Sequence, residues 1–242
     1  MISRSPVNLQ HAGCSVTGLV RSNNEDAWLG DAELGLFVVA DGMGGYQAGE
    51  LASAMTVQTL RERITAGDDL VNATQAVQNR LIQAAAHGEG NASMGTTMVA
   101  VRFSGLQFEL AWVGDSRAYL LHNGKLQQIS RDHSYVQSLV DRQIITASQA
   151  EQHPQRNLLT QCLSGGQFEQ PQVDIISGEL EGDDLLLLCS DGLSNELSDL
   201  ELAQLLYDHG TQPLADLIQR IIDAAMANGG RDNITALLVR AA

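Results

Sequence analysis

Short apolar runs of strand length constrain the fold of this chain more than any other feature of its sequence. The runs are Leu36–Ala40, Thr97–Phe103, Phe108–Val113, Ala118–Leu121, Leu185–Cys189 and Ile234–Val239. His122–Lys125 contains Asn-Gly, the signal of a tight hairpin, and is predicted to pair Ala118–Leu121 with Leu126–Ile129. Consecutive strands joined by such short turns indicate antiparallel sheet.

Helical patterns fall in blocks between and after these runs. Residues 68–86 carry apolar side chains at three- and four-residue spacing, which is typical of one buried helix face. Ser198–Glu201 has the spacing of a capping box, and Gly210 can end the helix that it opens. Pro213 and Gly229-Gly230 bracket a further helix. No linker divides the chain, so we expect one layered domain, residues 1–242, with helices outside the sheets.

Residues 134–166 break this regular pattern. Thr146–Gln149 can cap a short helix, but His153-Pro154 interrupts it and Ser164–Gly166 is loose. We therefore expect a partly helical surface flap, defined here as residues 134–166. Insertions of this kind often lie beside functional sites.

Charge and cysteine content narrow the possible partners and compartment. The chain has 14 Lys and Arg against 29 Asp and Glu, a formal charge of -15. Such a surface repels phosphate backbones, so we expect no nucleic-acid partner. Three cysteines without a C-x-x-C pair argue against disulfides and a thiolate zinc site. Residues 1–10 lack the apolar stretch of a signal peptide, and residues 185–189 are too few to span a bilayer. We expect a cytoplasmic protein without membrane insertion.

Three carboxylates share a position at the ends of predicted strands. Asp41 follows Leu36–Ala40 directly, Asp191 follows Leu185–Cys189 by one residue, and Asp232 stands just before the last run. In antiparallel sheet the end of one strand lies beside the start of its neighbour, so the three can meet at one edge. Carboxylates this close repel each other, and oxygen ligands suit hard cations such as Mg²⁺ or Mn²⁺. Each Asp-Gly pair taken alone is more often a plain turn than part of a metal site.

Longer motifs give the prediction its specificity. In chain order they are Arg21–Asp26, Val38–Gly45, Met94–Thr97, Trp112–Tyr119, Asp132–Ser134, Ser190–Leu193 and Gly230–Thr235. This order and spacing closely resembles the PPM (PP2C-like) phosphatases, particularly the small bacterial members that oppose Hanks-type kinases. The resemblance extends from Gly18 to Val239. It implies an α+β fold, a four-layer α-β-β-α sandwich of two antiparallel sheets flanked by helices.

The resemblance also implies a site with two Mn²⁺ or Mg²⁺ ions. It assigns Asp41 to both ions, with the Gly42 carbonyl helping at one of them. Asp191 and Asp232 are implied to complete the protein shell of the other ion. A water held between the ions would attack phosphoserine or phosphothreonine in line, with Asp41, Asp191, Asp232 and Arg21 as the catalytic set.

Further residues receive roles from the same resemblance. Glu25 and Asp26 are implied to act close to the ions, partly by holding water. Asp115, with Asp191, matches the ligands of a third, weaker ion in bacterial relatives; a turn residue is the alternative. Arg21 matches the arginine that grips the substrate phosphate, and a surface charge is its alternative.

The proton donor to the leaving group is the point where the sequence departs from animal members of the family. Those members carry a histidine where this chain has Met43, which cannot donate a proton. We expect a water on the metal to take this role. His133 is a weaker candidate, for which a hydrogen-bonded structural role is the alternative.

Two other functions remain open at this stage. A two-metal phosphodiesterase would use similar carboxylates, and a catalytically weak relative could serve as a phosphoprotein-binding regulatory module. The expected partners are phosphoproteins, including a Ser/Thr kinase or a forkhead-associated protein, and the chain is expected to be a monomer.

Overall fold

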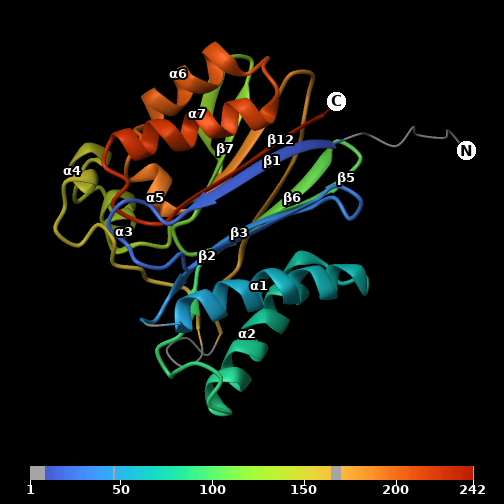
Figure 1. Ribbon diagram of the computed structural model, residues 1–242, viewed down its shortest axis with the longest axis vertical. Coiled ribbons are helices and arrows are strands. Elements are labelled where there is room, and N and C mark those ends of the chain that lie inside the picture. The colour runs from blue at the N-terminus through green and yellow to red at the C-terminus, as the bar shows by residue number, and fades with distance from the viewer. Residues whose placement is uncertain (1–8, 46, 165–169, 242) are drawn as a thin grey trace, which may run out of the picture.

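Two antiparallel β-sheets packed face to face form the centre of the molecule, and helices cover both outer faces (Figure 1). The structure is a computed structural model that describes residues 9–45, 47–164 and 170–241. The four layers confirm the predicted α+β sandwich. Gly165 and Gly166, which belong to the predicted loose end of the flap, and the first eight residues lie outside the described residues.

The first sheet has the strand order β1-β12-β11-β7-β8. Its strands are β1 (Leu9–Val16), β12 (Ile234–Ala241), β11 (Leu185–Cys189), β7 (Arg117–His122) and β8 (Lys125–Gln128). The hairpin between β7 and β8 turns at Asn123 and Gly124, both at positive φ (49° and 74°). Asn-Gly favours this conformation, and the predicted hairpin is confirmed.

The second sheet has the order β10-β6-β5-β3-β4-β9, with β2 paired to β3. Its strands are β2 (Asp26–Asp31), β3 (Leu36–Met43), β4 (Gly95–Thr96), β5 (Met98–Ser104), β6 (Gln107–Val113), β9 (Leu163–Ser164) and β10 (Asp174–Glu179). Alternation along β3 fills two cores. Val38 packs towards the helices, whereas Phe37 and Val39 pack against the other sheet with Leu186 and Leu188.

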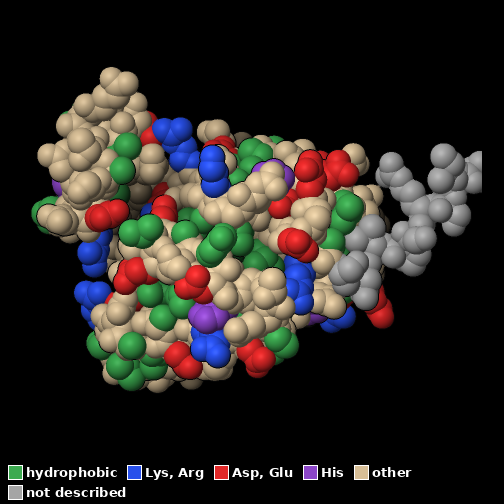
Figure 2. All heavy atoms as spheres, turned by 90° about the horizontal axis from the view of Figure 1, so that it is seen from above, with side chains coloured by type: hydrophobic (Ala, Val, Ile, Leu, Met, Phe, Trp, Pro, Cys, Tyr) green, Lys and Arg blue, Asp and Glu red, His purple; other side chains and the backbone are tan. Residues whose placement is uncertain are grey.

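Helices α1 (Ala48–Thr65) and α2 (Leu70–Ala86) cover the second sheet, and α6 (Asp199–His209) and α7 (Leu214–Ala227) cover the first (Figure 1). The predicted capping box at Ser198 is present. The Ser198 hydroxyl accepts a hydrogen bond from the Glu201 amide, and the Glu201 carboxylate accepts one from the Ser198 amide. On the face formed by α6 and α7, acidic and basic side chains are interspersed (Figure 2). Within the described part of the chain, no helix is long and apolar enough to cross a membrane.

The flap contains α3 (Tyr135–Asp141) and α4 (Ala147–Glu151). Thr146 caps α4 with the capping box that its spacing allows. The flap is closed at its base, since the Tyr135 amide donates to the Leu158 carbonyl at 2.8 Å. It stands next to the short helix α5 (Asp191–Ser194) at one end of the sandwich (Figure 1).

Candidate metal-binding active site

Acidic side chains gather at the end of the sandwich where β2, β3, α5 and the lead into β12 meet. Asp26 and Asp41 face each other across the antiparallel pair β2–β3. Asp191 is the first residue of α5, which directly follows β11, and Asp232 precedes β12, the neighbour of β11 in its sheet. Strand ends therefore bring together carboxylates that are up to 206 residues apart in the sequence (232 − 26).

Asp41 and Asp191 share a hydrogen bond between their carboxyl groups. Burial raises the pKa of both side chains above the usual range. Asp26 raises the pKa of Asp41 further, and Asp232 does the same for Asp191. Because burial and neighbouring negative charge oppose ionisation of both carboxyls, this is a site that prefers positive charge.

Hydrogen bonds fix the backbone of Asp41 on both sides. The Asp41 amide donates to Thr97 Oγ1 at 3.1 Å, and the Thr97 amide donates to the Asp41 carbonyl at 2.8 Å. Thr96 Oγ1 donates to the same carbonyl at 2.9 Å. The Thr97 hydroxyl also bonds Ser116 Oγ at 2.7 Å, which links Asp41 to the turn that carries Asp115.

Gly42 is required at its position by close packing. Its amide donates to the Glu25 carbonyl at 3.1 Å. A Cβ at residue 42 would collide with the Gly49 carbonyl oxygen, and one at residue 49 would lie 2.8 Å from the Glu25 carboxyl. The two glycines therefore let the end of β3, the start of α1 and Glu25 approach one another.

The two carboxylate oxygens of Asp26 differ in their hydrogen bonding. Its Oδ2 accepts hydrogen bonds from Thr235 Oγ1 (2.6 Å) and Ser190 Oγ (2.8 Å). Its Oδ1 is buried and has no hydrogen-bond partner among the residues that the structure describes. Burial raises the pKa of Asp26 to about 7, and Asp191 and Asp232 contribute to the increase. A buried oxygen without a partner is costly, and a cation or an ordered water would satisfy it.

Asp232 is held by Arg21, whose Nη2 donates to Asp232 Oδ2 at 2.7 Å. The Arg21 side chain is 55% exposed, so its guanidinium lies at the rim of the acidic edge. Glu25 lies nearby, and its pKa is raised chiefly by burial, against the charge of Arg21. Asp115 follows β6, and burial and the nearby Asp191 raise its pKa.

The chemistry of this donor set fits a hard divalent cation. All the donors are oxygens, the carboxyls of Asp41 and Asp191 are hydrogen-bonded to each other, and Asp26 Oδ1 lacks a partner among the described residues. In the conformation described, no three His, Cys, Asp or Glu side chains among the described residues are arranged to hold an ion together. The reason is visible in the contacts: Asp41 and Asp191 bond to each other, and Asp232 bonds to Arg21. Ligation requires these side chains to exchange their present partners.

Asn233 is a positioning residue to which the sequence assigned no role. Its Oδ1 accepts the Glu25 amide at 2.8 Å. Its Nδ2 donates to the Thr17 carbonyl at 3.0 Å and to the Asn23 carbonyl at 2.8 Å. One side chain thus fixes residues 17–25, which carry Arg21 and Glu25, to the start of β12. Its place beside Asp232 in a long motif was the available signal.

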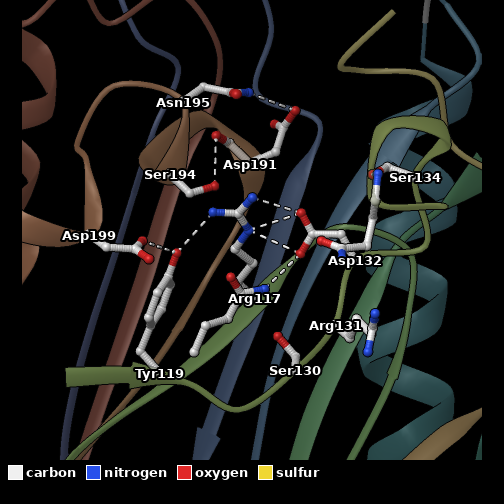
Figure 3. A network of polar contacts seen from close by, with 12 residues as sticks. Arg117, Tyr119, Ser130, Arg131, Asp132, Ser134, Asp191, Ser194, Asn195 and Asp199 are labelled. Carbon is white, nitrogen blue, oxygen red and sulfur yellow. Dashed lines mark hydrogen bonds and ion pairs between the residues drawn. The ribbon is translucent and has the colours of Figure 1, made fainter. Parts of the chain in front are cut away.

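A cleft of about 320 Å³ adjoins the acidic edge on the side of the flap. Figure 3 shows the Arg117 guanidinium between Asp132 and Tyr119 in its wall. Arg117 Nη2 donates to Asp132 Oδ2 at 2.7 Å, and Nη1 donates to the Tyr119 hydroxyl at 3.0 Å. The Tyr119 hydroxyl in turn donates to Asp199 Oδ1 at 3.0 Å. Arg117 is thus paired with Asp132 and Tyr119 in the wall of the cleft.

The structure favours the structural interpretation of His133. The side chain is buried, and its Nδ1 accepts the Gly114 amide at 3.1 Å. The ring proton is therefore on Nε2, which lies 3.4 Å from Asp174 Oδ2. Thr160 donates its amide to the His133 carbonyl at 2.8 Å, so this residue ties the base of the flap to the turn before Asp115.

The fold and the acidic edge together define a class: the PPM-type metal-dependent phosphatases, built as α-β-β-α sandwiches. The family profile described as "Protein phosphatase 2C" matches residues 19–238. The chain therefore belongs to the protein phosphatase 2C family.

Named relatives and solved structures agree with this assignment. Serine/threonine protein phosphatase PstP of Mycobacterium tuberculosis (strain ATCC 25618 / H37Rv) is 38% identical over 243 residues, covering 98% of this chain and 46% of that protein. The chain thus spans about half the length of this relative. Serine/threonine phosphatase stp of Listeria monocytogenes is 35% identical over 92% of each chain. The catalytic domain of PstP in complex with 2 manganese ions has a TM-score of 0.84 and 35% identity, covering 96% of this chain and 98% of that one.

Proposed function

We propose that this chain, residues 1–242, acts as a single phosphatase domain that hydrolyses phosphoserine and phosphothreonine on proteins in a metal-dependent reaction. The observation that carries the proposal is the half-buried, hydrogen-bonded Asp41–Asp191 carboxyl pair at the meeting of strand ends, with Asp26 and Asp232 beside it. Membership of the protein phosphatase 2C family supports the same reaction, as do the names of the relatives.

The residues proposed to hold two Mn²⁺ or Mg²⁺ ions are Asp41, the Gly42 carbonyl, Asp191 and Asp232. Ions bound there would lower the pKa of a water and offset the negative charge of the phosphoryl oxygens. Asp26 and Glu25 are proposed to hold water beside them, since Asp26 Oδ1 has no partner in the described part of the protein. Asp115, with Asp191, is proposed to bind a third, weaker ion.

Arg21 is proposed to bind the substrate phosphate. Its exposed guanidinium can donate two parallel hydrogen bonds to phosphoryl oxygens, which orients the group. The ion pair with Asp232 keeps this guanidinium next to the carboxylates when substrate is absent. With Met43 unable to donate a proton and His133 engaged by Gly114 and Asp174, we propose water as the proton donor to the leaving group.

The proposed substrates are phosphoproteins, including a Ser/Thr kinase of Hanks type or a forkhead-associated protein, in the cytoplasm and with the phosphatase as a monomer. A signalling role is supported by the likeness to PppA, described as a key regulatory component of T6SS in Pseudomonas aeruginosa, which is 36% identical with a TM-score of 0.84.

Substrate class is tested by comparing two phosphoesters. With Mn²⁺ present, we expect hydrolysis of a phosphothreonine peptide and little hydrolysis of bis-p-nitrophenyl phosphate, a diester. Preference for the diester would favour a phosphodiesterase. Tight binding of the phosphopeptide without turnover would favour a regulatory module.

A further inference from the structure

Two large apolar side chains lie exposed directly before Arg21. Leu19 is 67% exposed and Val20 is 70% exposed. Single exposed apolar residues are ordinary, but adjacent ones at the rim of a site are a mark of an interaction surface. We call Leu19 and Val20 the apolar rim.

The loop that carries the apolar rim is fixed by hydrogen bonds and close packing. The Leu19 amide donates to the Gly230 carbonyl at 2.6 Å. Gly18 has φ +79°, and a Cβ there would collide with the Asp232 carbonyl oxygen, so the turn packs tightly on the lead into β12. Asn233 fixes both ends of the loop through the Thr17 and Asn23 carbonyls. The loop therefore holds Leu19 and Val20 in solvent.

The apolar rim adjoins the proposed phosphate-binding group. The Leu19 side chain packs against Gly230, since a Cβ at that glycine would lie 3.2 Å from Leu19 Cγ. Arg21 donates a hydrogen bond to Asp232, which is two residues beyond Gly230 in the same segment. An extended peptide advances about 3.3–3.6 Å per residue. A phosphoresidue held by Arg21 would therefore bring a side chain one or two positions away onto Leu19 and Val20.

We propose that the apolar rim is a subsite for an apolar side chain within two residues of the phosphorylated residue. The inference rests on the proposed function and deepens it: the favoured substrates are phosphoserine or phosphothreonine sites flanked by Leu, Ile, Val, Met or Phe. Contact with such a side chain removes apolar surface of both partners from water. The carboxylates of Glu25 and Asp232 beside Arg21 disfavour an acidic flanking residue.

The test uses phosphothreonine peptides that differ in one flanking position, Leu against Gly, at each of the two positions on either side. Wild-type protein with Mn²⁺ is expected to prefer Leu at one position by about fivefold to tenfold in kcat/KM, as partial burial of a leucine allows. Leu19→Ser and Val20→Ser are expected to bring this ratio close to one. Val71→Ser is the matched control: Val71 is also exposed but lies on α2, in the helix layer outside the second sheet, and its variant is expected to keep the wild-type ratio.

The outcomes separate this inference from the function on which it rests. No preference in the wild type, or a preference that survives both rim substitutions, would overturn the subsite while leaving the phosphatase intact. Failure of the wild type to hydrolyse any of the phosphopeptides would overturn both. Circular dichroism of each variant checks that it is folded.

Discussion

Arg21 and Asp232 form an ion pair, but we propose that Arg21 binds phosphate and that Asp232 binds metal. Single substitutions distinguish these two roles. Arg21→Ala removes charge-assisted hydrogen bonds to phosphate, so we expect KM to rise by about tenfold to a hundredfold with metal affinity near that of wild type. Asp41→Asn and Asp232→Asn remove proposed metal ligands, so turnover and Mn²⁺ affinity should both fall by about a hundredfold or more.

Steady-state kinetics and Mn²⁺ titration calorimetry supply the two measurements. If Arg21→Ala weakened Mn²⁺ binding as strongly as Asp41→Asn, the phosphate-binding role of Arg21 would be wrong.

Asp26 gives the metal-free protein a predictable pH dependence. Its pKa is raised from 3.8 to about 7 in the folded state, chiefly by burial. A raised carboxyl pKa means that the folded state binds more protons than the unfolded state between these values. The contribution of Asp26 to the free energy of unfolding is therefore largest below about pH 4, and it is lost as the pH rises towards 7.

Urea unfolding of the metal-free protein at pH 5 and pH 7.5 measures this fall in the free energy of unfolding. We expect Asp26→Asn to show a smaller fall than wild type, with a remainder from Asp41, Asp115 and Asp191, whose pKa values are also raised. An Asp26→Asn variant with the full wild-type fall would contradict the assignment.

Among the elements, the flap is the one with a proposed part in substrate selection. Arg156 and Asp191 line the same cleft, and the Arg156 guanidinium donates only to the Glu151 carbonyl, at 3.1 Å, among the hydrogen bonds of the described residues. We expect Arg156→Ala to change kcat/KM for phosphoproteins severalfold and that for p-nitrophenyl phosphate much less.

Arg142→Ala is the matched control, because Arg142 is an exposed flap residue outside the cleft lining. Kinetics of both substrates at saturating Mn²⁺ check the prediction. Equal effects of Arg156→Ala on the two substrates would leave the flap without a part in selection.

Buried apolar strands and elements with turn or capping signals could be predicted, whereas half-buried strands without such signals could not. β3 and β11 are buried runs, which the sequence shows directly. β10 alternates between exposed and half-buried residues, and β2 is half-buried throughout, so neither carries a strong strand signal. α1 buries mainly small and hydroxyl residues, including Ala52, Ser53 and Thr56, and so lacks an apolar stripe.

Some residues of the site could also be predicted from the sequence, and others could not. The strand-end positions of Asp41, Asp191 and Asp232 could be read from the sequence, whereas roles for Arg21 and Asp115 required the family resemblance. The hydrogen bonds of Asn233 and His133 could not be predicted at all. Asn233 reaches Glu25 across 208 residues of sequence, and such contacts exist only once the sheets have formed.

For the whole molecule, metal binding and folding are coupled through the acidic edge. The carboxylates converge only in the folded state, so a bound ion stabilises that state selectively. At a concentration about 100 times Kd, one ion contributes about 2.7 kcal/mol. That corresponds to a rise in Tm of roughly 5–10 °C for a chain of this size.

Thermal unfolding with Mn²⁺ and with EDTA measures this shift, and Asp41→Asn is the control that should lose most of it. An equal rise in Tm for wild type and Asp41→Asn would show that the ion binds elsewhere.

We expect carboxylate-bound divalent ions to be required for hydrolysis of phosphoproteins, and a single turnover assay measures this requirement. Purified protein is stripped with EDTA, its metal content is measured, and release of phosphate from a phosphothreonine peptide is followed as Mn²⁺ is added back. We expect no turnover without metal and recovery on addition of Mn²⁺. Full turnover by protein whose metal content is shown to be zero would contradict it.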